Sequence, residues 1–262
     1  MFQRRMEMEY TNFNINNPEQ QIDAMFQKVK GLSYNNINEI MRTTAEVERL
    51  FSRYRNNTEL LILQTRLQIL NSQEQKARAI ANQVWQIGGN IRIEYEKMYL
   101  SDLINLGMID MATILIKPRF QNIAENIKIF PLEMIRYALI TGNTSLLKKI
   151  SSAAANKPLF QALAQFANTY QHARYDSHFA NIQKIVLENI GNVICGYDFN
   201  FYTDRGFTDI DIILYFSNYD FNLNQYKMLI NNKIDGYCLT AGIKRIHNLN
   251  FVFRKIKDHP KI

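Results

Sequence analysis

Along the first 187 residues, apolar side chains recur every three or four positions, which is the spacing of helices that bury one face. The first such stretch starts at Asn17-Pro18, a typical helix start, and stops at Gly31. The second runs from Asn36 to Asn56-Asn57, and the later stretches are separated by glycine or proline. These separators are Gly88, Gly89, Pro118, Pro131, Gly142 and Pro158. The pattern predicts an all-helical region over residues 1–187.

Two helical segments share one sequence pattern at an offset of 35 residues. The segment 104–115 aligns with the segment 139–150, and the alignment superimposes Gly107 on Gly142. A third, weaker copy follows at Phe179, Ile182 and Ile185. The pattern resembles degenerate ankyrin-like repeats from about residue 95, although the Thr-Pro-Leu-His hallmark is missing. Helical repeats and an irregular helical bundle both explain the spacing.

The pattern changes near residue 188, where short apolar and β-branched stretches replace the helical spacing. We expect strands within residues 189–196, 210–216 and 250–256, and a helix over residues 223–231. The predicted fold class is therefore mainly α. An N-terminal helical repeat or bundle over residues 1–187 precedes a small α+β domain over residues 188–262.

Two aspartates stand two positions apart at the start of the second predicted strand. In a strand, Asp209 and Asp211 point to the same face and lie about 7 Å apart, at roughly 3.3–3.4 Å per residue. Carboxylates in this arrangement suit two Mg²⁺ ions that bridge a triphosphate, because Mg²⁺ takes oxygen ligands. The same residues also fit a helix start, with Thr208 as the N-cap and Asp211 as an acid in the first turn. The two interpretations predict different secondary structure over residues 209–217.

Residues 193–216 resemble the polymerase-β-type nucleotidyltransferase superfamily, in which a strand, a small-residue turn and a short helix precede a strand bearing Asp-hydrophobic-Asp. The resemblance places the turn at Gly196 and the short helix at residues 199–202. By the same resemblance, Arg205 and Thr208 would be the basic residue and the hydroxyl residue that often precede the aspartates. It is closest to divergent members, such as abortive-infection toxins and predicted nucleotidyltransferases of large DNA viruses.

The resemblance implies a two-metal transfer reaction. Asp209 and Asp211 would bind Mg²⁺, and an NTP would contact Gly196, Arg205 and Thr208. An acceptor hydroxyl would attack the α-phosphate, so that a nucleoside monophosphate is transferred and pyrophosphate leaves.

Two features depart from the family's pattern. Tyr197 replaces the second small residue of the turn, and Asp198 adds a negative charge where phosphates would lie. A third carboxylate is expected on a later strand, but Asp235 precedes a glycine and Asp258 falls after the last predicted strand. An active enzyme and an inactive copy therefore both fit the sequence, and we expect weak Mg²⁺ binding.

The formal net charge is +7, and basic residues are concentrated near the end of the chain. The final nineteen residues contain six lysines and arginines against one aspartate. The candidates for contact with nucleic-acid phosphates are Lys244, Arg245, Arg254, Lys255 and Lys257. A solvated basic surface explains the same residues.

The remaining features bear on location and on alternative functions. The sequence shows no secretion signal and no apolar run near the roughly 18 residues that a membrane span needs. Two cysteines are too few for a disulfide framework. We expect a cytoplasmic or nuclear protein, or one within a viral particle, and no membrane partner. Besides nucleotidyl transfer, the sequence fits a non-catalytic helical binding or assembly protein with a protein partner, or a nucleic-acid-binding protein.

Overall fold

The computed structural model describes residues 17–155, 157–172, 176–204, 207–217, 222–244 and 248–256. Within these ranges the chain is mainly helical and carries a small three-stranded sheet, as predicted for the fold class. The helices that precede the sheet are α1 (Pro18–Gly31), α2 (Ile37–Arg53), α3 (Thr58–Leu70), α4 (Glu74–Ile87), α5 (Ile93–Asn105), α6 (Ile109–Ile116), η1 (Lys117–Asn122), α7 (Ile123–Ile129), α8 (Pro131–Ile140), α9 (Thr144–Ala153), α10 (Pro158–His172) and α11 (Asp176–Ile190). The following elements are β1 (Ile194–Asp204), β2 (Phe207–Phe216), α12 (Leu223–Ala241) and β3 (Leu249–Lys255).

Three helical hairpins, α3–α4, α5–α6 and α8–α9, follow one another at a constant offset of 35 residues. Their first helices end at Leu70, Asn105 and Ile140, and their second helices begin at Glu74, Ile109 and Thr144. The offset predicted from the segments around Gly107 and Gly142 is therefore confirmed. The period also extends to α3–α4, an earlier copy that the sequence pattern did not reveal.

The turns of the three hairpins have the same backbone hydrogen bonds. In the second hairpin, the N–H groups of Leu106, Gly107 and Met108 donate to carbonyls four, three and five residues earlier. The N–H groups of residues 71–73 and 141–143 donate at the same separations. The middle residue of each turn has a positive φ, which is 56° at Ser72, 66° at Gly107 and 64° at Gly142. These hairpins are therefore copies of one local structure, which we call the hairpin array.

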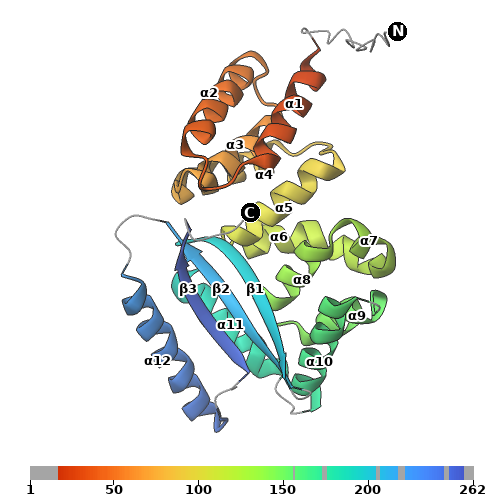
Figure 1. The fold of residues 1–262 in the computed structure, drawn as a ribbon, viewed down its shortest axis with the longest axis vertical. Coiled ribbons are helices and arrows are strands. Elements are labelled where there is room, and N and C mark those ends of the chain that lie inside the picture. The colour runs from red at the N-terminus through yellow and green to blue at the C-terminus, as the bar shows by residue number, and fades with distance from the viewer. Residues whose placement is uncertain are drawn as a thin grey trace, which may run out of the picture.

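The sheet has the order β1-β2-β3. β1 and β2 are antiparallel neighbours, and β2 and β3 run parallel with α12 as the connection between them. One face packs on α10 and α12, through the ring of Phe201 against Phe166 and the ring of Phe216 stacked on Tyr226. Figure 1 shows α1 to α4 above the sheet, α5 to α10 to its right, α11 behind it and α12 along its left side.

The sheet is attached to the hairpin array by polar contacts as well as by apolar ones. Arg78 of α4 donates to the carbonyl oxygens of Gly191 and Ile194, at 2.9 Å each. The Tyr197 N–H donates to the side-chain oxygen of Asn105 at 3.1 Å. The buried apolar residues of the helices and of the sheet belong to one continuous core. Residue 188 therefore marks a change of secondary structure rather than a break in the core.

Three predictions for the C-terminal region are wrong. Residues 199–202 belong to β1 rather than to a short helix, and Gly196 lies within β1 rather than in a turn. The physical reason is the alternation of Tyr197, Phe199 and Phe201 with polar residues, which suits a strand with one buried face. The alternative prediction of a helix that starts at Thr208 is also wrong, because that residue is in β2. The strands predicted within residues 210–216 and 250–256 and the helix within α12 are confirmed, whereas the strand predicted within residues 189–196 starts only at Ile194, because α11 continues to Ile190.

Candidate functional site

The two aspartates lie together on one face of β2, as the strand interpretation predicted. Asp209 is exposed and Asp211 is partly exposed. Across the sheet, Tyr202 is the partner of Asp209, and Asn200 and Asn250 are the partners of Asp211. The Asn250 side-chain amide donates to Asp211 Oδ1 at 3.2 Å. The result is an open, polar sheet face with two carboxylates.

A third carboxylate does not join this pair in the part of the chain that the structure describes, where no cluster of three metal-ligating His, Cys, Asp or Glu side chains occurs. Asp198 lies further along the same face of β1, but its carboxylate is paired with Arg136 of α8 at 3.3 Å. Asp235 lies on α12, which packs against the opposite face of the sheet through Tyr226. Asp258 lies outside the described residues.

The residues expected to contact an NTP are not gathered around the aspartates. Gly196 faces Tyr215 across the strands, and a Cβ at Gly196 would lie 3.1 Å from the Tyr215 Cβ. Close packing therefore explains this glycine without a phosphate. Thr208 is 1% exposed and donates to the Gln165 side-chain oxygen of α10 at 2.9 Å, on the face opposite to the aspartates. Arg205 lies outside the described residues.

Among the described residues, the basic side chains near the end of the chain do not form one surface. Arg254 and Lys255 are consecutive in β3, so their side chains point to opposite faces. Lys244 is exposed in the segment that follows α12. Arg245 and Lys257 lie outside the described residues.

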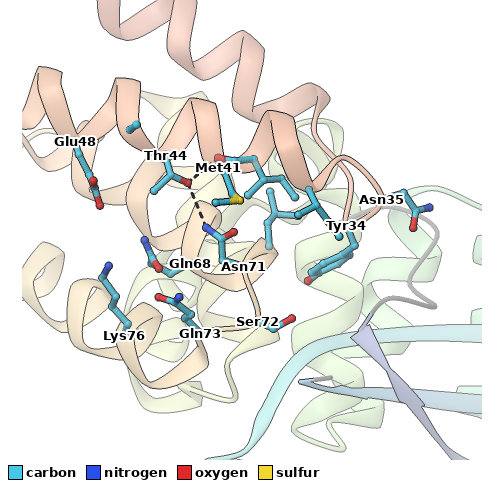
Figure 2. Close-up of a pocket in the computed structure, with 14 residues that line it drawn as sticks. Tyr34, Asn35, Met41, Thr44, Glu48, Gln68, Asn71, Ser72, Gln73 and Lys76 are labelled. Carbon is cyan, nitrogen blue, oxygen red and sulfur yellow. Dashed lines mark hydrogen bonds between the residues drawn. The ribbon is translucent and has the colours of Figure 1, made fainter. Parts of the chain in front are cut away.

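Two hollows on the helical region were not predicted from the sequence. The first is a cavity of about 760 Å³ between α2 and the turn of the first hairpin. Figure 2 shows Met41, Thr44 and Glu48 on one side of it and Gln68 to Lys76 on the other, with the Asn71 amide donating to the Thr44 hydroxyl at 3.2 Å. Four uncharged amides line it together with hydroxyl groups and the charged side chains of Glu48 and Lys76.

The second hollow, which we call the α5–α8 groove, is a cavity of about 620 Å³ between successive first helices of the hairpin array. Two of its walls come from α5 and from the end of α7 with α8, and four pairs of their residues occupy equivalent positions of the repeat. Phe26 and Lys30 of α1 and Arg66 of α3 complete the lining. The equivalent pairs, each 35 residues apart, are Glu94 and Ile129, Lys97 and Leu132, Met98 and Glu133, and Ser101 and Arg136. The signal that could have located the groove is the 35-residue period extended through α3.

Comparison with protein-family models, with curated proteins and with solved structures finds no match for this chain. Among the described residues, none of the helices combines the length and the apolar content required to cross a bilayer. The function must therefore be argued from the geometry alone.

Proposed function

We propose that this chain is a non-catalytic binding protein that presents the α5–α8 groove to a peptide segment of a protein partner. The observation that carries the proposal is the repetition of the groove walls. Equivalent positions of consecutive hairpins face the same cavity, as in tandem helical arrays that bind along one continuous surface. The cavity is within the size range of small binding sites, about 300–1,000 Å³.

Exposed apolar side chains at the rim of the groove support this function. Ile93, Ile129 and Leu132 are 37%, 44% and 45% exposed, although each lies beside the cavity. Neighbouring apolar residues on a surface favour an interaction site, because covering them removes apolar area from water. The positions come from α5, α7 and α8, so a partner that covers them spans two hairpins.

The test is the selection of peptides from a random library displayed on phage, with the full chain immobilised. The Kd of each recovered peptide is then measured by calorimetry for the wild type, Leu132→Ser and Leu239→Ser. Leu239 is a matched control, because it is 85% exposed on α12. We expect Leu132→Ser to raise the Kd at least about fivefold, through the loss of apolar burial, and Leu239→Ser to leave it unchanged. Recovery of no peptide, or equal Kd values for all three proteins, would show that the proposal is wrong.

A second candidate function is nucleotidyl transfer at Asp209 and Asp211, or the binding of Mg²⁺ with an NTP by an inactive copy. It is favoured by the position of both carboxylates on one open face of β2. The measurement is pyrophosphate release from Mg²⁺ and a mixture of the four NTPs, with an RNA acceptor. Release that disappears in the Asp209→Asn/Asp211→Asn variant would favour this function over the first one.

A further inference from the structure

Two arginines at the same position of the helical repeat line the buried side of the α5–α8 groove. Arg66 of α3 and Arg136 of α8 are each 8% exposed. Ser101 of α5 occupies the equivalent position between them, 35 residues from each. Because serine is much smaller than arginine, the middle helix fills less of the groove at this position than an arginine would.

The two guanidinium groups are paired to different degrees. Arg66 Nε lies 2.6 Å from the carboxylate of Asp102, which is fully buried. Arg136 has longer contacts, 3.3 Å to Asp198 and 3.5 Å to the Ser101 hydroxyl, whereas charge-assisted hydrogen bonds are about 2.7–2.9 Å. Its Nε is buried and has no hydrogen-bond partner within the described ranges. Since a guanidinium group has five donors, Arg136 keeps donors for a ligand.

The charges around the groove favour an anion. Lys30 and Lys97 join the two arginines in the lining, and Glu94 and Glu133 are its acidic residues. Glu133 is 5% exposed, and burial raises the pKa of its carboxyl group. A carboxyl group with a raised pKa opposes an incoming anion less than an ordinary glutamate does. Four cations therefore line the groove with one exposed acid and one buried acid, while Asp102 and Asp198 pair with Arg66 and Arg136 from outside the lining.

We propose that the groove binds an acidic side chain of the partner peptide, held by Arg136 and Arg66, with apolar neighbours of that residue on Ile93, Ile129 and Leu132. This inference rests on the proposed function, because it names the chemistry of the peptide that the groove accepts. Arginine binds carboxylates through two parallel N–H bonds, so the arrangement distinguishes an acid from an amide of the same shape.

The test uses three N-acetylated, C-amidated heptapeptides that differ only at the central position. Their sequence is Ser-Leu-Leu-X-Leu-Ile-Ser, with Glu, Gln or Lys as X, and the Kd for the full chain is measured by calorimetry. We expect the Glu peptide to bind about tenfold more tightly than the Gln peptide, and the Lys peptide to bind more weakly still.

Variants of the chain test whether the preference for the Glu peptide arises in the groove. In Arg136→Gln, we expect the ratio of the Gln and Glu Kd values to fall to about one. Lys97→Gln changes a partly exposed wall residue without touching the Asp198 ion pair, and should lower the ratio about threefold. Arg42→Gln, at a side chain 78% exposed on α2, should leave the ratio unchanged.

The outcomes separate this inference from the proposed function. Equal Kd values for the three peptides, or a ratio that neither groove variant changes, overturns the inference. If library peptides bind through Leu132 but carry no acid, the inference fails and the proposed function stands. If no library peptide binds, both fail. Inorganic phosphate that binds as tightly as the Glu peptide and competes with it would assign the cavity to free anions instead of a peptide.

Discussion

The hairpin array and the sheet are built in different ways, and the difference is clearest where they meet. The hydrogen bonds of each hairpin turn join residues three to five positions apart. In the sheet, β1 and β2 pair as the two arms of a long hairpin, and β2 pairs with β3 across the whole of α12, so the paired residues are much further apart in sequence. The two later turns of the array are covered by the elements that lead into the sheet. A Cβ on Gly107 would lie 2.4 Å from the Gly191 oxygen, and one on Gly142 would lie 2.4 Å from the Ala180 Cα.

The first turn of the array, at Ser72, differs from these two. Ser72 has the same positive φ as the two glycines, and its turn borders the open cavity of Figure 2. Ser72 is partly exposed, whereas a Cβ at Gly107 or Gly142 would lie against main-chain atoms. The repeat therefore sets the backbone of each turn, while contact with α11 and its C-terminal end selects glycine at the two later turns.

The largest expected effect is at the junction itself. Gly142→Ala combines an unfavourable positive φ with a Cβ placed against the backbone of α11, so we expect the free energy of unfolding to fall by about 4 kcal/mol. Gly242→Ala is the matched control, because Gly242 has a φ of 67° and no atom within 4 Å of the added Cβ. It should lower that free energy by only about 1 kcal/mol. Urea titrations of both variants measure the difference, and equal losses would mean that contact with α11 is unimportant.

The helices and the repeat could be predicted from the sequence because their determinants are local. Apolar spacing, capping residues and the glycines at residues 107 and 142 all act within a few positions. The copy α3–α4 was missed because Ser72 stands where the later turns have glycine, and the groove was missed with it. The equivalence of Arg66, Ser101 and Arg136 becomes visible only once the three copies are superimposed.

The sheet was predicted only in part because its determinants are distant in sequence. The alternation around Asp209 and Asp211 was sufficient to place both carboxylates on one face of a strand. The segment from Tyr197 to Phe201 alternates in the same way, but the resemblance to a nucleotidyltransferase placed a turn and a helix there. Alternation along β2 also places Thr208 on the face opposite to the aspartates, but its hydrogen-bond partner there, Gln165 of α10, is 43 residues away in sequence.

The second prediction concerns Asp102, the buried carboxylate of the array. Burial outweighs the ion pair with Arg66 and raises the pKa of Asp102 to about 7. The folded state then holds a proton that the unfolded state releases near pH 4, so this group makes the protein less stable as the pH rises from about 4 to about 7. Relative to Asp102→Asn, the wild type should lose about 3 kcal/mol of unfolding free energy over that range.

Urea titrations of the wild type and Asp102→Asn at pH 5, 6, 7 and 8 isolate this contribution, because other titrating groups affect both proteins. A wild type that instead gains stability over the asparagine variant as the pH rises would indicate that the Arg66 ion pair outweighs burial.

The third prediction concerns the positive φ that Ser72 shares with Gly107 and Gly142. Ser72→Gly should raise the free energy of unfolding by about 1 kcal/mol, since glycine accepts the φ of 56° without the cost that serine bears. Ser152→Gly, at an exposed position of α9, should lower it by a similar amount because glycine weakens helices. Thermal melts of the two variants should therefore shift in opposite directions. Shifts of the same sign would contradict the equivalence of the three turns.

The smallest expected effect is at the aspartate pair of the sheet. Two metal ions need enough carboxylates to offset their mutual repulsion, and here Asp198 is paired with Arg136 instead of joining Asp209 and Asp211. We therefore expect millimolar affinity for Mg²⁺ with ATP. At about 1 mM ligand, such an affinity stabilises the protein by less than about 0.5 kcal/mol, which raises the Tm by less than about 2 °C. Thermal melts of the wild type and of Asp209→Asn/Asp211→Asn, each with and without Mg²⁺-ATP, measure this. A rise of several degrees that the double variant loses would mean that another residue completes the site, and would move the functional centre from the groove to the sheet.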